Sequence, residues 1–164
     1  MRSDPVTIRD AEWPRDEDAA REFIMGSQHF EHIVEPNRRL DPPVAAEHLA
    51  KLKDDVARHG GRFLIAVDGV GAALGWVVAH EDDDGAFVTS AERRFVYISE
   101  LFVVEAARGT GVGRALIAAC EDWARERGIS IMHIAVLGAN ARAAKIYTHA
   151  GYAPYSLRLR KYLP

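Results

Sequence analysis

The sequence predicts an α/β (α+β) fold, with helices packed on a central mixed β-sheet. Residues 95–104 and 131–137 have the apolar pattern of buried strands, and a glycine loop and an amphipathic helix lie between them. This βαβ arrangement predicts that the two strands run parallel. Two other β-rich runs, residues 62–67 and 73–80, flank Asp68 and Gly69, which is typical of an antiparallel hairpin. Parallel and antiparallel pairs in one chain indicate a mixed sheet.

The composition is that of an ordinary globular protein. The 164 residues fit one domain spanning residues 1–164, and 48% of them are hydrophobic and 27% charged. The formal net charge of -3 gives no reason to expect nucleic acid as a partner. Cys120 is the only cysteine, which excludes a disulfide framework and a cysteine-based zinc site. The start lacks the pattern of a signal peptide and no run approaches about 20 apolar residues, so we expect a cytoplasmic protein without membrane association.

The N-terminal part predicts one strand and two helices. Residues 6–9 are β-prone, and Asp16 is placed to cap a first helix whose apolar residues recur at helical spacing. Residues 27–39 have no steady period and predict an irregular loop. Asp41 then caps a second helix, which ends at Gly60.

The remaining elements follow from periodicity and glycine positions. Residues 81–85 predict an acidic turn after the hairpin, and residues 95–104 are apolar on both faces, as in a central strand. The helix after the glycine loop ends at Gly128, and a last helix begins with Asn140 as its cap and ends at Gly151. The final residues predict a pair of short strands around Pro154.

The segment "EAARGTGVGRALI" places three glycines directly before a helix. Backbone N–H groups at a helix N-terminus favour phosphate, and glycine lets the phosphate approach them closely. A P-loop needs Lys-Ser or Lys-Thr after its last glycine, whereas Arg114 and Ala115 follow Gly113. A dinucleotide fingerprint lacks its third glycine here, and no acidic residue follows the next strand to bind a ribose. The remaining pattern is Arg108-x-x-Gly111-x-Gly113.

This pattern resembles the pyrophosphate loop of the GCN5-related N-acetyltransferases (GNAT), [Arg/Gln]-x-x-Gly-x-[Gly/Ala]. Its context resembles the family too, since "YISELFVVEAARGTGVGRALI" is similar to the central strand, loop and helix, and "NARAAKIYTHAGY" to the Asn…Tyr…Gly-[Phe/Tyr] segment. The resemblance extends over nearly the whole chain and is weakest over residues 27–39. It implies a mostly antiparallel sheet of six to seven strands, a parallel pair splayed at the acetyl-CoA site, and about four helices.

The resemblance also implies acetyl-CoA as cosubstrate and assigns its contacts. A bulge is expected near residues 101–104, where backbone N–H groups of Leu101 and Val103 would face the thioester carbonyl and the pantetheine arm. The side chains of this stretch are also expected to be apolar core. The cofactor-binding set comprises Leu101, Phe102, Val103, Arg108, Gly109, Thr110, Gly111, Val112, Gly113, Arg114 and Asn140.

The same resemblance gives Tyr147 the role of general acid for the CoA sulfur. By pattern alone, a tyrosine in a helix is usually a core or boundary aromatic, and Asn140 is a helix cap. Glu100 is the candidate base, because a carboxylate within an apolar strand needs a specific reason. A structural or substrate-binding role for Glu100, with deprotonation through a water chain, stays open. Ser99 points to the opposite face.

The acceptor is expected to be a primary amine of a small molecule or peptide. Its site would be walled by residues 27–39, the start of the second helix and the acidic turn at 81–85, whose mixed charges do not select one amine. His29 and His32, with Glu31 and Glu35, suggest a solvated surface rather than a metal site, so we expect no metal.

Two other functions are compatible with the same fold. One is a non-catalytic acyl-CoA-binding or regulatory domain, which would have less use for Tyr147 and Glu100. The other is a toxin-type acetyltransferase acting on charged tRNA, which would need a basic acceptor surface. A homodimer is compatible with the sequence, which does not fix the oligomeric state.

Overall fold

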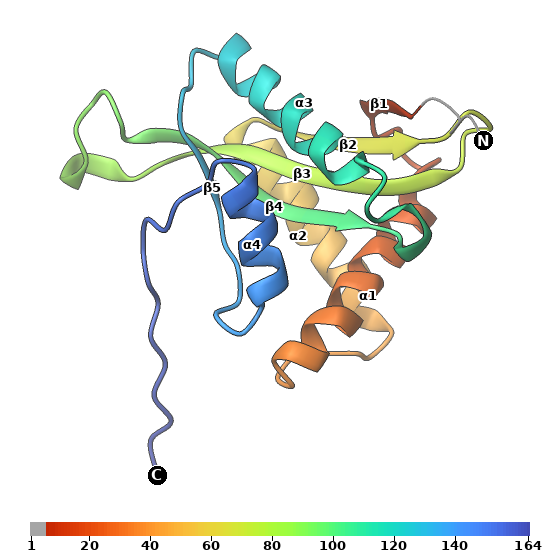
Figure 1. The fold of residues 1–164 in the computed structure, drawn as a ribbon, viewed down its shortest axis with the longest axis horizontal. Helices are drawn as coiled ribbons and strands as arrows, with labels where there is room; N and C mark the ends of the chain where they lie inside the picture. Colours follow the sequence, from red (N-terminus) through yellow and green to blue (C-terminus); the bar gives the residue numbers. More distant parts are fainter. Residues whose placement is uncertain (1–5) are drawn as a thin grey trace.

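The structure is a computed structural model that describes residues 6–164, and Figure 1 shows its helices arranged around one central sheet. Two single-turn 3-10 helices, Gly85–Phe87 and Glu105–Ala107, interrupt the connections on either side of the central strand. The main elements are β1 (Thr7–Asp10), α1 (Glu17–Val34), α2 (Pro43–His59), β2 (Gly61–Val67), β3 (Ala73–Asp83), β4 (Arg94–Val103), α3 (Val112–Glu126), β5 (Met132–Ile134) and α4 (Ala141–His149).

The sheet is mixed, as predicted, with strand order β1-β2-β3-β4-β5. The first four strands pair antiparallel, and β4 and β5 pair parallel over three residue pairs. The sheet has five strands rather than six or seven, and the expected strands around Pro154 are not formed. Figure 1 shows that the residues after α4 run away from the body instead of along β5. Despite their strand-like pattern, they therefore pair with no strand within residues 6–164.

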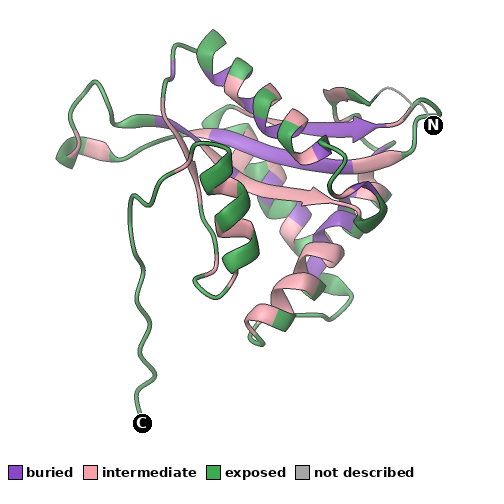
Figure 2. Cartoon of the chain, viewed as in Figure 1, coloured by how far each residue is buried: buried purple, intermediate pink, exposed green. Residues whose placement is uncertain are grey.

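Helices cover both faces of the sheet. On one face, α1 and α2 pack through Phe23 and Leu49 against Trp76 of β3. On the other face, α3 packs through Leu116 and Cys120 against neighbouring strand residues. Successive side chains of a strand point to opposite faces, and helices cover both faces of this sheet. Consecutive residues of β2 and β3 are therefore buried, and the two strands form the buried band in Figure 2.

Helix α1 corrects the predicted loop at residues 27–39, because it continues to Val34. Its C-terminal turns lack an apolar stripe since they face a polar cavity, and periodicity alone therefore missed them. Gly26 allows a close approach in this helix: a Cβ there would lie 2.4 Å from Cζ of Phe102. The helix thus packs directly against the end of β4.

One predicted helix cap is wrong, one is confirmed in position only, and two helix ends are confirmed. Asp16 occupies the N-cap position of α1, but its side chain makes no capping bond and instead accepts hydrogen bonds at 2.6 and 2.8 Å from the guanidinium of Arg9, which competes for the carboxylate. Asp41 is likewise drawn into an ion pair with Arg39, and α2 begins after Pro42. Asn140 caps α4 by accepting a hydrogen bond from the Ala143 N–H at 3.1 Å, and Gly60 ends α2 with φ +65°.

The strands β3 and β5 differ in length from the prediction. β3 continues through Asp83, so most of the expected acidic turn is strand, because residues 81–83 pair with the start of β4. β5 is shorter than residues 131–137, since it pairs with β4 only up to Ile98.

Within residues 6–164, no helix is both long and apolar enough to cross a membrane.

Candidate active site

The glycine loop ends at the N-terminus of α3, as the sequence predicts. Gly111 has φ +97°, a left-handed conformation that favours glycine, and it begins the helix without a side-chain cap. Within residues 6–164, the backbone N–H groups of residues 109–111 donate to no acceptor, and those of residues 112–114 lie in the first turn of α3, where a helix offers no acceptor one turn earlier. Thr110 stabilises the turn by donating its hydroxyl to the Ala107 carbonyl at 2.7 Å. The loop therefore presents a row of free donors at the positive end of a helix, which fits a phosphate group.

Gly113 is the second glycine of the helix start. A Cβ at this position would lie 3.7 Å from Cγ2 of Val103, an ordinary contact distance, and its backbone is not left-handed. The protein's own packing therefore does not require glycine at position 113. What its missing side chain leaves open is the approach to the backbone N–H groups.

Two arginines flank the loop. Arg108 donates from Nε to the Val103 carbonyl at 3.0 Å, and its guanidinium lies 5.6 Å from the centre of the Phe102 ring. Arg114 is exposed and forms no ion pair within residues 6–164. Arg108 also lines an open cavity of about 640 Å³ between α1 and the end of β4. The loop thus combines backbone donors with two cationic side chains.

The end of β4 has one free edge. β5 pairs only with residues 96–98 of β4. The Val104 N–H donates to the Leu74 carbonyl at 2.9 Å, on the β3 side. Because N–H groups alternate between the two edges of a strand, those of Leu101 and Val103 point toward the free edge. The parallel pair is therefore splayed where the resemblance places the thioester and the pantetheine arm.

The β-bulge lies earlier than predicted. The register of β4 against β3 shifts between Val78 and Ala79, which leaves Ser99 as the extra residue rather than one of residues 101–104. Ser99 donates its hydroxyl to the Val78 carbonyl at 3.2 Å. An extra residue bends the strand and re-aims the side chain that follows it, which here is Glu100.

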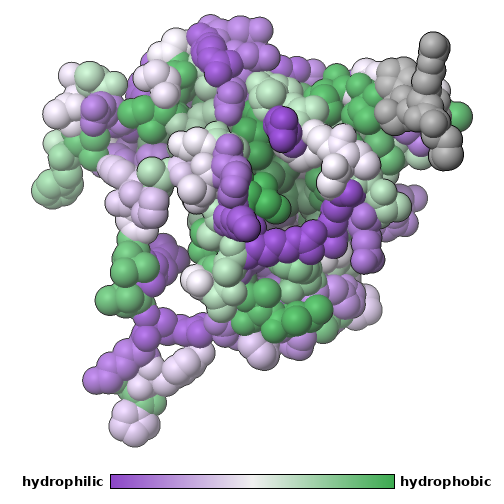
Figure 3. Space-filling view, viewed as in Figure 1, coloured by the Kyte–Doolittle hydropathy of each residue, from purple (hydrophilic) through white to green (hydrophobic). Residues whose placement is uncertain are grey.

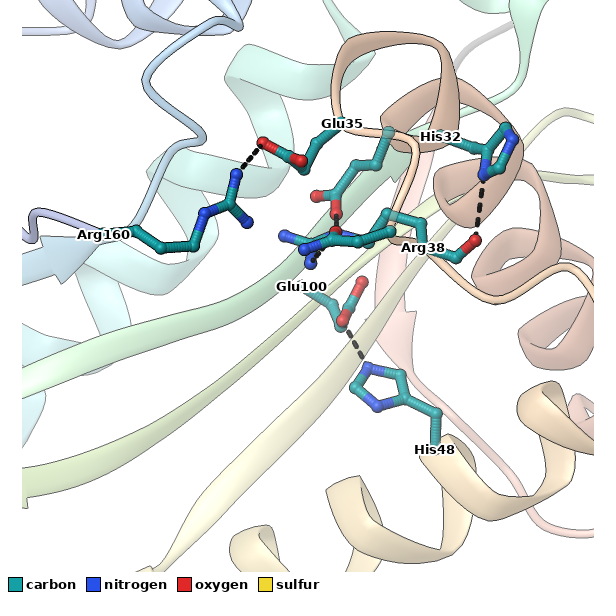
Figure 4. A network of polar contacts seen from close by, with 8 residues as sticks. His32, Glu35, Arg38, His48, Glu100 and Arg160 are labelled. Atoms are coloured by element: carbon teal, nitrogen blue, oxygen red, sulfur yellow. Dashed lines mark hydrogen bonds and ion pairs between the residues drawn. The ribbon is translucent and has the colours of Figure 1, made fainter. Parts of the chain in front are cut away.

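Glu100 faces a polar cavity of about 230 Å³ between α1 and α2. Its Oε1 lies 2.6 Å from Nε2 of His48, and the two side chains are only 15% and 29% exposed. Figure 4 shows Glu100 between His48 and Arg38, which come from opposite walls. His48 was not anticipated, since a single histidine on a helix has no distinguishing pattern. The cavity lining comprises Ile24, Ser27, Gln28, Glu31, Arg38, His48 and Glu100.

Part of residues 27–39, which the sequence predicts to wall the acceptor site, lines this cavity. Arg38 donates from Nε to Glu31 at 2.7 Å, and His32 holds the connection by bonding the Arg38 carbonyl at 2.9 Å (Figure 4). Arg39 does not take part, because it pairs with Asp41 and Glu47 outside the cavity.

The acidic turn and the candidate metal ligands lie elsewhere. Glu81 of the predicted turn is bound by Arg94 and Arg127 and does not line the cavity. His29 is bonded to the Met25 carbonyl at 2.7 Å. No group of three or more metal-binding side chains converges within residues 6–164.

Tyr147 and Asn140 lie on α4, two turns apart. Burial raises the pKa of Tyr147 to about 12, and the negative charges of Glu31 and Glu100 add to the shift. The hydroxyl therefore stays protonated at neutral pH and remains a proton donor. Asn140 uses its side-chain oxygen as a cap, which leaves its amide N–H groups available.

A profile of the acetyltransferase (GNAT) family matches residues 18–152, a span that includes the glycine loop, Glu100 and Tyr147. The chain belongs to this family. Acetyltransferases of the GNAT family use acetyl-CoA.

Two curated relatives are similar to this GNAT protein over most of its length. A mycothiol acetyltransferase from Amycolatopsis mediterranei is 31% identical over 161 residues, which cover 90% of this chain and 51% of the relative. The D-amino-acid N-acetyltransferase HPA3 from Saccharomyces cerevisiae is 30% identical over 153 residues, with 93% and 88% covered. The chain spans about half the length of the first relative. Over a third relative, the mycothiol acetyltransferase of Beutenbergia cavernae, the match covers 32% of that protein.

Solved structures agree on the fold. A BH1408 protein variant from Bacillus halodurans superposes with a TM-score of 0.80 at 21% identity and covers 96% of this chain and 99% of its own. AAC(6')-Iy, in complex with the bisubstrate analogue CoA-S-monomethyl-acetylneamine, gives a TM-score of 0.69 at 20% identity, with 97% and 99% covered. These structures support the GNAT fold of this chain.

Proposed function

We propose that this GNAT protein transfers the acetyl group of acetyl-CoA to a primary amine of a small molecule, by direct attack in a ternary complex. The observation that supports this most is the placement of Glu100 in a polar cavity, with its Oε1 2.6 Å from Nε2 of His48. Tyr147 supports the proposal as a proton donor, because burial raises its pKa to about 12.

The glycine loop would bind the pyrophosphate of the donor. The free N–H groups of residues 109–114 would donate to its oxygens, and Arg108 and Arg114 would balance its charge. The free edge of β4 would hold the rest of the donor, with the Leu101 and Val103 N–H groups directed at the pantetheine arm and the thioester oxygen. Asn140 would add an amide hydrogen bond from α4.

The acceptor amine must lose a proton before it attacks. An alkyl ammonium with a pKa of about 10 is about one part in a thousand neutral at pH 7. Glu100 would accept this proton in the cavity, and His48, which is more exposed, would exchange it with solvent. Tyr147, protonated at neutral pH, would donate a proton to the thiolate as the C–S bond breaks. The donor and acceptor of protons are thus separate groups.

The cavity favours a small acceptor. Its volume of about 230 Å³ and its two carboxylates, Glu31 and Glu100, suit a compact cationic amine, and Arg38 supplies one positive charge for a polar substituent. The named relatives support the same size class, since one is named a D-amino-acid N-acetyltransferase and the other a mycothiol acetyltransferase.

A thiol-release assay with acetyl-CoA and a panel of amines tests the proposal. The panel would contain D- and L-amino acids, aliphatic polyamines, amino sugars and a lysine peptide, each compared with a reaction without amine. We expect release above this background for at least one small amine, with acetyl-CoA binding measured in parallel by calorimetry. Binding without release for every amine would favour the non-catalytic domain. No binding at millimolar acetyl-CoA would refute the whole proposal.

A further inference from the structure

The polar cavity between α1 and α2 differs in exposure from one wall to the other. The Glu100 side chain on β4 is 15% exposed, whereas the side chains of Arg38 and Glu31 are 30% and 35% exposed. Figure 4 shows the Arg38 guanidinium and the His48 ring on either side of Glu100. A ligand in the cavity would therefore meet a carboxylate at the inner end and a guanidinium near the mouth.

The inner end offers hydrogen-bond acceptors that have no donor. Glu100 directs only Oε1 at His48, and its Oε2 accepts no hydrogen bond within residues 6–164. Gln28 also lines the cavity, and its side-chain oxygen is buried without a hydrogen-bond partner among the same residues. Buried acceptors are almost always paired, so these two oxygens indicate a ligand that brings N–H donors. A primary ammonium carries three such donors.

The charges of the cavity suit one ammonium rather than two. Two carboxylates line it, and one of them, Glu31, already accepts a hydrogen bond at 2.7 Å from Nε of Arg38. Glu100 is therefore the lining carboxylate whose charge no lysine or arginine balances within residues 6–164. A second ammonium, as in a diamine, would lie beside Arg38 and be repelled by it.

Arg38 provides a cation that is held in place and retains a free donor. His32 bonds its backbone carbonyl at 2.9 Å, and Glu31 fixes its Nε. Nη1 donates to the Asn37 side chain at 3.2 Å, while Nη2 donates no hydrogen bond within the described part of the chain. A guanidinium with spare N–H groups suits a carboxylate, which it would hydrogen-bond as well as attract.

The size and the lining of the cavity limit the ligand further. Its volume of about 230 Å³ is below the range of about 300–1,000 Å³ that is typical of sites for drug-sized molecules. The lining residues come from α1, the connection after it, α2 and β4. The basic C-terminal segment, residues 153–164, is separated from most of the body by an open gap in Figure 3 and lines no part of the cavity. Among residues 6–164, Arg38 is therefore the arginine that a ligand in the cavity would contact.

We propose that the acceptor is a small zwitterion that carries one amine and one carboxylate, as a free amino acid does. Its amine would bind Glu100 and Gln28 at the inner end, and its carboxylate would bind Arg38 near the mouth. This inference rests on the proposed function, because it assigns the acceptor of the same acetyl transfer. It separates amino acids from diamines, amino sugars and other amines without an acid group, since these lack a partner for Arg38.

Steady-state acetylation of matched acceptor pairs tests the inference. Each small D- or L-amino acid is compared with its own amide, which keeps the amine and lacks the carboxylate, and the readout is the ratio of the two kcat/KM values. Arg38→Gln should lower this acid-to-amide ratio by at least about tenfold, the effect of losing a charged hydrogen bond. Arg38→Lys, which keeps the charge, should lower the ratio less. Arg39→Gln is the matched control and should leave the ratio unchanged, because Arg39 pairs with Asp41 and Glu47 outside the cavity.

The outcomes separate this inference from the proposed function. Both members of a pair are measured on one protein, so a general loss of activity or stability in a variant does not change the ratio. A ratio that Arg38→Gln leaves at the wild-type value would overturn the inference while amine acetylation stands. So would a wild type that acetylates diamines in preference to amino acids. A wild type that binds acetyl-CoA but acetylates no amine would instead refute the proposed function, and the inference with it.

Discussion

Replacing Gly113 by alanine should separate the stability of α3 from its ligand-binding role. The new Cβ would lie 3.7 Å from Cγ2 of Val103, so the protein accommodates it without strain. Alanine in a helix is favoured over glycine, and near the helix start we expect a gain of about 0.5 kcal/mol in the free energy of unfolding. For a chain of this size, the gain raises Tm by about 1–2 °C.

Acetyl-CoA affinity should change little in the same variant, because the family pattern accepts alanine as well as glycine at this position, but it should fall in Gly113→Asp. The aspartate carboxylate would stand beside the N–H groups at the start of α3, where it would compete with a phosphate oxygen and repel its charge. Loss of one hydrogen bond to a charged group costs about 1.5–3 kcal/mol, which corresponds to about a 10- to 100-fold increase in Kd. Calorimetric titration with acetyl-CoA measures Kd, and differential scanning calorimetry measures Tm on the same protein.

Two other glycines provide the controls. Gly111→Ala and Gly71→Ala each place alanine in a left-handed conformation, at φ +97° and +87°, with no heavy atom within 4 Å. Both should lower stability by a similar amount, about 1–2 kcal/mol, but only the first should weaken acetyl-CoA binding. A Gly113→Asp variant with unchanged Kd would refute the assignment of the loop to phosphate.

Four further variants address catalysis and stability. Tyr147→Phe should lower kcat by about 100-fold with little change in the Kd of acetyl-CoA. Because the pKa of Tyr147 is about 12, the wild-type hydroxyl should remain a proton donor up to pH 10. Full activity in the variant would exclude Tyr147 as the general acid. Glu100→Gln should lower kcat/KM by about 100-fold at pH 7, and this deficit should shrink toward pH 10, where much of the amine is neutral without a base. A deficit that is constant with pH would indicate a structural role for Glu100. His48→Gln should show a smaller deficit with the same dependence on pH. Arg9 lowers the pKa of Asp16, so this pair stabilises the fold above about pH 4, the unfolded pKa, and its contribution is lost as pH falls through the lower folded value. Asp16→Asn should therefore lose about 2 kcal/mol in urea unfolding at pH 7 and much less at pH 3, and an equal loss at both would contradict the ion pair.

Much of the fold was predictable because local rules determine it. Turn chemistry indicated the β2–β3 hairpin, and the strand, glycine loop, helix and strand around α3 indicated the parallel pair. The two caps that failed, Asp16 and Asp41, failed for a shared reason. Each carboxylate has an arginine nearby in the fold, and an ion pair competes with a capping bond.

The candidate site was predictable only where one segment supplies it. The glycine loop and its arginines are contiguous, so their chemistry is visible in the sequence. Glu100 was noticeable as a charge in an apolar strand, but its partner His48 is 52 residues away on α2. A residue whose role depends on a distant neighbour leaves no periodic signal, and the same holds for the polar turns of α1 beside Arg38.

The sequence by itself determined the order of the main elements, the parallel pair and the glycine loop before α3, because backbone preferences and hydrophobic periodicity act over a few residues. Only the tertiary structure decided how far α1 extends, which histidine meets Glu100, where the bulge re-aims that carboxylate, and that the C-terminal segment pairs with no strand among residues 6–164. These features depend on contacts between distant segments, and such contacts form only when the sheet and its two helical layers are assembled.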